Sequence, residues 1–267
     1  MLKYLYILMV IFMIDNGYLF SKDDKRIFIN TSMSCNGQCS YCYLPQLGYS
    51  NSDSNINTKS AEEIIKMIEQ LPKLTQDTLI TIGCFSECWN KYNKLETLKL
   101  ISYFLKKGNQ VQISTKKKIN LNEIKEFLPL IKYYGQFIIF ESIATISFHD
   151  YFEKNTDDVF ERLETFKIKE VPIVLYIKPV LKNITIEDLE QYKKYILQYQ
   201  IKDVVVGSLF TNIPSNESVP FSNQNELFYN PVDDEEIMLQ ELSKFCNTYK
   251  RSSAVMNYYK SRNRRKD

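Results

Sequence analysis

The chain has 267 residues, of which 44% are hydrophobic, so a disordered protein is excluded and one large α/β domain is expected. Its 34 Lys and Arg residues stand against 32 Asp and Glu, and a formal net charge of +2 argues against strong non-specific binding to DNA. His149 is the one histidine, which argues against histidine-based zinc sites and against Ser/His/Asp or Cys/His hydrolases. The seven glycines form neither a dinucleotide-binding motif nor a P-loop.

The N-terminal segment, residues 1–25, opens with an unbroken apolar run from Tyr4 to Ile14. This run is too short to cross a bilayer, which needs about 20 residues. No small-residue cleavage site follows it. A buried strand that turns at 15–17 and returns over 18–20 is therefore favoured over a signal peptide or an anchor. We expect a cytoplasmic protein, because the cysteine chemistry below suits a reducing compartment.

From residue 26 onward the pattern alternates between strand and helix. Six apolar, β-branched runs predict strands at 26–31, 78–83, 111–115, 137–142, 171–178 and 202–208. Helices are expected between them: from a capping box at Ser60 to residue 71, over 95–107, 121–134 and 157–167, and from Thr185 onward. Continuous apolar strands alternating with helices indicate an α/β fold with a partial (β/α)6 parallel barrel. The site of such a barrel lies on the loops that follow its strands.

Three regions follow from this pattern: the segment 1–25, the partial barrel 26–210 and a C-terminal region 211–267. Residues 211–232 are rich in Asn, Ser and Pro and predict a loop, while 233–250 predicts a helix. The basic residues from Lys260 to Lys266 are interpreted as a solvated chain end. His149, after the fourth strand, is interpreted as a surface residue.

The strongest chemical signal is a triplet of cysteines, Cys35, Cys39 and Cys42, directly after the first barrel strand. Three thiolates on one tight loop suit an iron–sulfur cluster, and a cubane cluster with three protein ligands keeps one iron open. The alternative is a zinc loop, which needs a fourth ligand that Cys84 or Cys88 could supply.

The run from Cys35 to Tyr43, CNGQCSYCY, resembles the signature of the radical S-adenosylmethionine (SAM) superfamily. The resemblance implies that Cys35, Cys39 and Cys42 hold a 4Fe-4S cluster and that SAM binds the open iron. In that family the reduced cluster cleaves SAM to a 5′-deoxyadenosyl radical, which abstracts hydrogen from a substrate. The usual fold of the family is a (β/α)6 partial barrel.

Within the superfamily, residues 26–210 are most similar to spore photoproduct lyase and photolyase-like proteins. The matching elements are Tyr41-Cys42-Tyr43-Leu44, Cys84-Phe85-Ser86-Glu87, Thr115-Lys116, Ser142 and Lys178-Pro179. The similarity implies that Ser86, Lys116 and Ser142 contact SAM, with Lys116 suited to the carboxylate of its methionine. Glu87 stands at the family's acidic position, where Asp is usual, and the resemblance places it with them among the cofactor-binding residues.

The same resemblance implies roles for Cys84, Tyr41 and Tyr43. In the lyase a cysteine at this place returns hydrogen to the product radical, and the two tyrosines relay the radical. A small buried cysteine that only packs is the alternative interpretation of Cys84.

The sequence therefore predicts a radical SAM enzyme with lyase-like repair or redox-neutral chemistry. A tailoring enzyme acting on a peptide, sugar or small metabolite is the second interpretation, and a non-catalytic iron–sulfur protein is the third. The expected partners are a nucleic-acid, peptide or small-molecule substrate and an electron donor such as flavodoxin or ferredoxin. Residues 211–267 show nothing that matches the DNA-binding region of the lyase.

Overall fold

A computed structural model describes residues 18–23, 25–50, 52, 57–70, 74–220 and 227–263. The apolar run 4–14 and the turn 15–17 lie outside these residues. Within the described part of the chain, no helix has the length and apolarity needed to cross a membrane.

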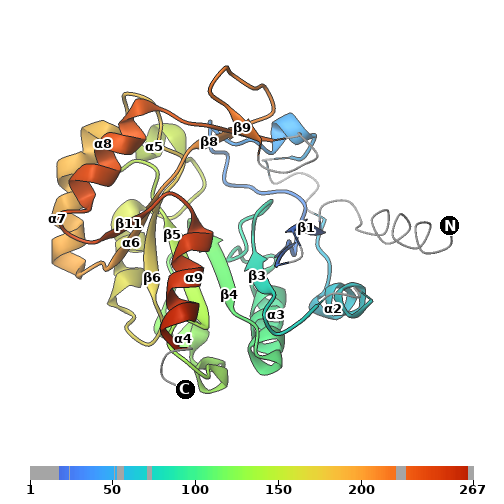
Figure 1. Ribbon diagram of the computed structural model, residues 1–267. Coiled ribbons are helices and arrows are strands. Elements are labelled where there is room, and N and C mark those ends of the chain that lie inside the picture. The colour runs from blue at the N-terminus through green and yellow to red at the C-terminus, as the bar shows by residue number, and fades with distance from the viewer. Residues whose placement is uncertain are drawn as a thin grey trace.

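An eight-stranded sheet forms the centre of the molecule, in the order β1-β2-β3-β4-β5-β6-β7-β11 (Figure 1). The strand β1 (Leu19–Asp23) runs antiparallel to β2 (Arg26–Ile29) at one edge. The other strands run parallel to β2: β3 (Leu79–Ile82), β4 (Val111–Thr115), β5 (Phe137–Ser142), β6 (Ile173–Ile177), β7 (Asp203–Val206) and β11 (Asn247–Tyr249). The six predicted strands are confirmed in order and direction, and β11 extends the partial barrel by one.

Helices cover the outer face of the sheet, where Ile, Leu, Val and Phe from strands and helices form the largest core cluster. They are α2 (Ala61–Glu69), α3 (Lys94–Lys107), α4 (Leu121–Ile124), α6 (Val159–Leu163), α7 (Leu189–Tyr199) and α8 (Asp233–Leu242), with 3-10 turns at Leu128–Leu130, Glu164–Lys167 and Thr185–Asp188. The short helix α5 (His149–Phe152) and the 3-10 turn Pro45–Leu47 lie instead at the cysteine loop. The capping box predicted at Ser60 is present, because Ser60 and Glu63 bond to each other's backbone amides at the start of α2.

The inner face of the sheet is covered in part by the last helix, α9 (Ser252–Asn263) (Figure 1). Apolar side chains of β5, β6 and β7 pack against Val255 and Met256 of this helix. Two polar bonds fix it in place: Tyr259 Oη donates to Asp203 Oδ2 at 2.6 Å, and Gln110 Nε2 donates to the Met256 carbonyl at 2.9 Å. The helix thus closes one half of the open barrel.

One predicted helix, 121–134, is wrong over most of its length. The α-helix ends at Ile124, and a 3-10 turn over 128–130 follows. Pro129 explains the difference, because it lacks an amide hydrogen and disfavours helical backbone in the residue before it.

The C-terminal region also differs from the prediction. The segment predicted as a loop contributes a small antiparallel sheet of β8 (Leu209–Thr211), β9 (Val219–Pro220) and β10 (Phe228–Asn230). The helix predicted over 233–250 stops at Leu242, and 247–249 form β11 beside β7. Lys260 and Arg262 belong to α9 rather than to a solvated end, and Lys260 Nζ lies 2.8 Å from Asp77 Oδ1.

Candidate active site

The cysteine loop follows β2, at the end of the sheet where a parallel barrel places its chemistry. Its backbone is anchored to a distant segment: Cys39 forms a β-bridge with Glu153, and the Ser40 amide donates to the Phe152 carbonyl at 2.9 Å. A tight turn brings the last two cysteines together, because the Cys42 amide donates to the Cys39 carbonyl at 3.1 Å. Tertiary contacts therefore fix the loop, and not only its own turns.

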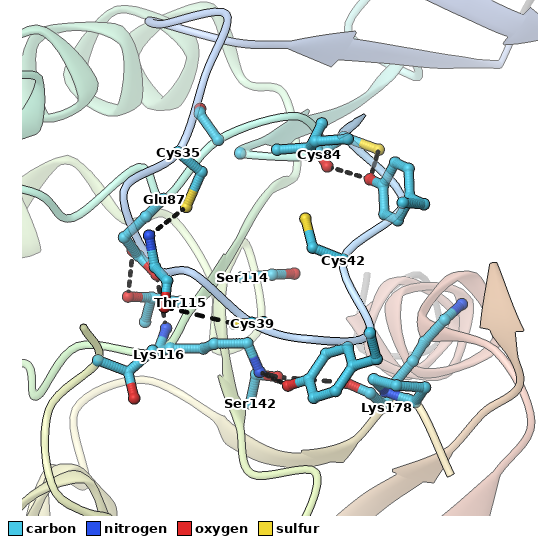
Figure 2. A pocket seen from close by; sticks show the side chains of 18 of the residues that line it. Cys35, Cys39, Cys42, Cys84, Glu87, Ser114, Thr115, Lys116, Ser142 and Lys178 are labelled. Atoms are coloured by element: carbon cyan, nitrogen blue, oxygen red, sulfur yellow. Dashed lines mark hydrogen bonds between the residues drawn. The ribbon is translucent and has the colours of Figure 1, made fainter. Parts of the chain in front are cut away.

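The three thiols line one cavity with about 870 Å³ of empty space that opens to solvent (Figure 2). All are free thiols, and burial raises the pKa of Cys35 to about 12 and of Cys39 to about 11. Both are therefore protonated at neutral pH, and a cluster that binds them must displace those protons. Gly37 lies between them, where a Cβ would stand 3.3 Å from Cys35 Sγ and 3.6 Å from Cys39 Sγ.

The donor set fits an iron–sulfur cluster, whose protein ligands are cysteine thiolates. Cys35, Cys39 and Cys42 all line the same cavity. Among the described residues, no three Cys, His, Asp or Glu side chains converge closely enough to hold one metal ion.

The second wall of the cavity is the loop after β3. Glu87 accepts hydrogen bonds from Thr115 Oγ1 at 2.6 Å, from the Lys116 amide at 2.7 Å and from the Trp89 amide at 2.9 Å. It therefore fixes the end of β4 against this loop. Ser86 Oγ is buried at the cavity wall and has no hydrogen-bond partner among the described residues. A buried hydroxyl without a partner is costly, so Ser86 fits a polar group of a bound molecule.

The third wall carries Lys116, directly after β4, and Ser142, the last residue of β5. Lys116 Nζ donates to Ser142 Oγ at 3.0 Å, to Tyr41 Oη at 2.8 Å and to Glu153 Oε1 at 2.7 Å. The two residues that were predicted to hold SAM are therefore in contact with each other. All three donors of the ammonium have partners, so one of these contacts must be exchanged when Lys116 binds a carboxylate.

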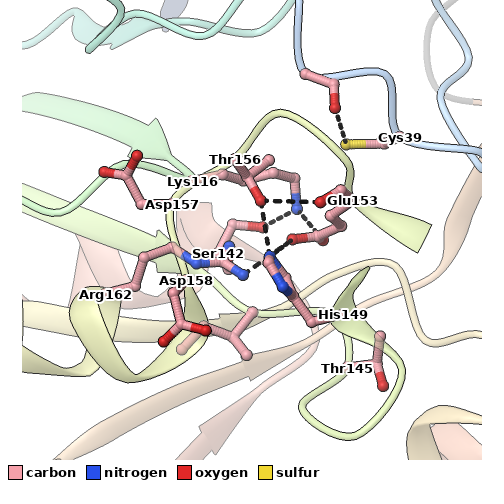
Figure 3. Close-up of polar contacts among 12 residues, drawn as sticks. Cys39, Lys116, Ser142, Thr145, His149, Glu153, Thr156, Asp157, Asp158 and Arg162 are labelled. Carbon is pink, nitrogen blue, oxygen red and sulfur yellow. Dashed lines mark hydrogen bonds and ion pairs between the residues drawn. The ribbon is translucent and has the colours of Figure 1, made fainter. Parts of the chain in front are cut away.

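Behind Lys116 lies a buried ion network that sequence reasoning missed (Figure 3). Glu153 and Arg162 have fully buried side chains and are joined at 3.0 Å, and Arg162 Nη1 also donates to the Ser142 carbonyl at 2.5 Å. Burial alone would raise the pKa of Glu153, but the charges of Lys116 and Arg162 lower it to about 2. The carboxylate is therefore ionised and holds Lys116 in the cavity wall.

One signal for this network was present in the sequence. Arg162 shares a helical face with Val159, Leu163 and Phe166, which are all buried. An arginine on an apolar face needs a buried acidic partner.

His149 was predicted on the surface and is in fact buried, with Nε2 2.8 Å from Thr156 Oγ1.

The structure separates the two tyrosines of the predicted relay. The Tyr43 hydroxyl donates to the Cys84 carbonyl, and its oxygen lies 3.8 Å from Cys84 Sγ. Tyr41 instead points its hydroxyl at Glu153 and Lys116. Cys84 is half-buried in the wall of the cavity, and burial raises the pKa of its thiol. Tyr176, which sequence reasoning did not single out, lines the same cavity.

These walls stand at the strand ends of a parallel partial barrel and bring Cys35, Cys39 and Cys42 to one cavity with Ser86, Lys116 and Ser142. A family model described as the radical SAM superfamily matches residues 29–196, and the chain belongs to this superfamily. It is accordingly an enzyme, and members of the family use a 4Fe-4S cluster and SAM. No curated protein matches the chain significantly.

Solved structures agree on the fold. A mutant of spore photoproduct lyase with bound AdoMet and dinucleoside spore photoproduct superposes with a TM-score of 0.64 at 14% identity, covering 89% of this chain and 81% of that one. The lyase complexed with dinucleoside spore photoproduct gives a TM-score of 0.63 at 15% identity over the same shares. Streptococcus suis SuiB bound to S-adenosylmethionine gives 0.56 at 12% identity, covering 85% of this chain and 50% of that one.

Proposed function

We propose that this enzyme catalyses a redox-neutral, lyase-like radical reaction in which Cys84 returns a hydrogen atom to the product. Cys35, Cys39 and Cys42 hold the cluster, and Ser86, Lys116 and Ser142 hold SAM. When bound, the two supply a 5′-deoxyadenosyl radical that takes one hydrogen atom from the substrate. The remaining chemistry belongs to side chains of this chain.

Lys116 and Ser142 orient the amino-acid part of SAM, since a fixed ammonium and a hydroxyl suit its carboxylate. Glu87 positions Lys116 by accepting a hydrogen bond from its backbone amide at 2.7 Å. Glu153, ionised and buried, pairs with the ammonium at 2.7 Å and so fixes its position in the cavity wall.

The position of Cys84 supports the proposal. Cys84 lines the cluster cavity, and it also lines a second cavity that lies on the inner face of the sheet over β2, β3 and β4. The Tyr43 hydroxyl oxygen lies 3.8 Å from the Cys84 sulfur. In the return step the S–H bond of Cys84 breaks, a C–H bond forms on the product radical, and a thiyl radical remains. Tyr43 then gives its O–H hydrogen to the thiyl. The tyrosyl radical takes back, from 5′-deoxyadenosine, the hydrogen first removed from the substrate, which re-forms the 5′-deoxyadenosyl radical. That radical would rejoin methionine as SAM and return the electron that cleaved it, so hydrogen and electrons both balance.

A substrate-free experiment tests this role. The reconstituted protein is incubated with SAM and dithionite in D₂O, where the Cys84 thiol exchanges to S–D, and the 5′-deoxyadenosine formed is analysed by mass spectrometry. We expect one solvent deuterium in the nucleoside from the wild type. The Tyr43 hydroxyl also exchanges with D₂O and can label the nucleoside, so the test is made in a Tyr43→Phe background, which should keep the label. Adding Cys84→Ala to that background should remove at least nine-tenths of the deuterium.

Cys88→Ala is the matched control, because Cys88 is fully buried next to this loop and bonds to the Ser114 carbonyl. It should retain the label. Equal deuterium in Tyr43→Phe and in the Cys84→Ala/Tyr43→Phe double variant, or none in either, would remove the hydrogen-donor role.

A further inference from the structure

His149 is a buried polar residue that the proposed mechanism does not use. It begins the helix α5, beside the ion network behind Lys116 (Figure 3), and only 7% of its surface is exposed. Its Nδ1 lies 3.1 Å from Asp150 Oδ1, and its Nε2 lies 2.8 Å from Thr156 Oγ1 and 3.7 Å from Glu153 Oε2. Burying an imidazole costs free energy unless its nitrogens are bonded, so an apolar side chain would fill this space at lower cost.

The two bonds of the ring define its tautomer. The side chain of Asp150 is fully exposed, and an ionised carboxylate only accepts hydrogen bonds, so Nδ1 carries the proton of the neutral ring. The other nitrogen, Nε2, is then the acceptor, and the Thr156 hydroxyl donates to it. His149 therefore connects the first residue of α5 to a residue that lies beyond the end of this helix.

The segment between these two residues depends on contacts of this kind. A helix of four residues is not stable by itself, because nucleating one turn costs more than its few hydrogen bonds return. The helix ends at Phe152, and the chain turns over 153–156. The bond from His149 to Thr156 holds this turn against the helix.

The turn 153–156 contacts two parts of the active site. On one side the Asn155 amide donates to the Gly37 carbonyl at 3.2 Å and supports the cysteine loop. On the other side the turn carries Glu153, whose Oε1 lies 2.7 Å from Lys116 Nζ. A shift of the turn would therefore move the lysine and the cysteine loop relative to each other.

We propose that His149 is a positioning residue for SAM: by binding Thr156 it fixes the turn 153–156, and the turn sets where Lys116 stands relative to the cysteine loop. The imidazole acts through Glu153 and not by contact with SAM. Residues that orient the direct ligands of a metal site change its affinity by about 10- to 100-fold when they are replaced, and a lysine that binds a carboxylate depends on its supports in the same way. This inference rests on the proposed function, in which Lys116 holds the carboxylate of SAM.

Equilibrium titration of the reconstituted, unreduced protein with SAM tests the inference. In His149→Gln the side-chain amide reaches the place of Nε2 and still bonds to Thr156, whereas the shorter amide of His149→Asn reaches only the place of Nδ1. We expect His149→Gln to bind SAM within about twofold of the wild type and His149→Asn to bind it about tenfold more weakly, the loss that corresponds to one hydrogen bond. Thr156→Val, which removes the hydroxyl and keeps the shape, should lose the same amount.

The double variant His149→Asn/Thr156→Val separates a shared bond from two independent effects. Because both changes break the same hydrogen bond, it should bind SAM no more weakly than either single variant. Asp150→Asn is the matched control, since it removes the exposed charge beside Nδ1 and leaves the bond to Thr156 in place. It should bind SAM as the wild type does.

Four results would overturn the proposal: wild-type affinity in His149→Asn, equal losses in His149→Gln and His149→Asn, a loss in the double variant that equals the product of the single losses, or an equal loss in Asp150→Asn.

A second measurement on the full chain needs neither cluster nor SAM. Amide hydrogen exchange reports on the Asn155 amide, which is bonded to Gly37, and on the Asp157 amide, which donates to the Lys116 carbonyl at 3.2 Å. Both should exchange at least about tenfold faster in His149→Asn than in the wild type or in His149→Gln. Unchanged exchange would show that His149 does not fix the turn.

The two proposals fail separately. A Lys116→Met variant that binds SAM like the wild type removes the role of Lys116 in the proposed function, whatever the exchange measurements show. A loss of SAM binding in Lys116→Met together with wild-type binding in His149→Asn removes the positioning role of His149 alone.

Discussion

At the residue scale, the buried carboxylate of Glu153 determines where Lys116 and Arg162 lie in the site. Glu153 pairs with both Lys116 and Arg162 and connects the end of β4, the end of β5 and the cysteine loop. A buried ion pair adds little net stability, but removing one partner leaves the other buried and uncompensated. The network therefore makes the position of Lys116 depend on a residue that lies outside the cysteine motif.

We predict that Glu153→Gln lowers the free energy of unfolding by about 3 kcal/mol, because it leaves Lys116 and Arg162 without a buried counter-charge. Urea unfolding followed by circular dichroism measures this. Glu161→Gln removes a carboxylate from the exposed side of α6 and should change stability by less than about 0.5 kcal/mol. Similar losses in the two variants would mean that the network does not stabilise the fold.

The residues that the sequence made predictable are those whose chemistry is local. The cysteine triplet, the loop after β3 and the Thr115-Lys116 step each follow a strand within a few residues, so their order along the chain already places them at one edge of the sheet. Glu153, Arg162 and Tyr176 join the site through tertiary contacts. Only Arg162 carries a local signal, and that signal does not name its partner.

At the element scale, the predictions held where apolar periodicity and caps agreed. The end of α3 at Gly108 and the start of α2 at Ser60 are examples. They failed where a short strand had no apolar pattern of its own: β11 reads Asn-Thr-Tyr and is recognisable only from its pairing with β7. Tertiary pairing overrode weak local preference there.

The loop after β3 depends on a glycine. Gly83 has φ +87°, and a Cβ on it would lie 2.9 Å from both Cβ and Sγ of Cys88. We predict that Gly83→Ala costs about 3 kcal/mol, the sum of left-handed backbone strain and overpacking. It should also disturb Cys84 and Ser86, which lie on the same loop.

Gly48→Ala isolates the backbone contribution, because Gly48 has φ +81° and a Cβ on it would meet no atom within 4 Å. That variant should cost about 1 to 2 kcal/mol. Thermal unfolding of the two variants side by side distinguishes them. A loss in Gly83→Ala no larger than that in Gly48→Ala would show that the contact with Cys88 relaxes freely.

At the scale of the whole molecule, the open barrel is closed by the last helix. The Tyr259 hydroxyl donates to Asp203 Oδ2 at 2.6 Å and so connects α9 to β7, while Lys260 connects the same helix to Asp77 ahead of β3. The helix α9 thus forms one wall of the cavity that lies on the inner face of the sheet over β2, β3 and β4.

We predict that Tyr259→Phe destabilises the protein by about 1 to 2 kcal/mol, because it removes a buried hydrogen bond to a carboxylate. Tyr258→Phe, which removes a hydroxyl bonded to Arg262 on the exposed side, should cost less than about 0.5 kcal/mol. Denaturant unfolding of both variants measures the difference. Equal values would mean that the Asp203 contact does not hold α9 in place.

The central claim is that three cysteines on one loop hold a cluster that cleaves SAM. The most direct measurement is anaerobic: the protein is reconstituted with iron and sulfide, SAM and dithionite are added, and 5′-deoxyadenosine is quantified. Cys246→Ala, which removes a thiol outside the cavity, serves as the control for Cys39→Ala.

We expect the wild type and Cys246→Ala to form 5′-deoxyadenosine at similar rates, and Cys39→Ala to form at most about a hundredth as much, because a cluster missing one of its three protein thiolates is not held for SAM. A Cys39→Ala variant that cleaves SAM as fast as the wild type would contradict the account. So would a wild-type protein that binds zinc in place of the cluster.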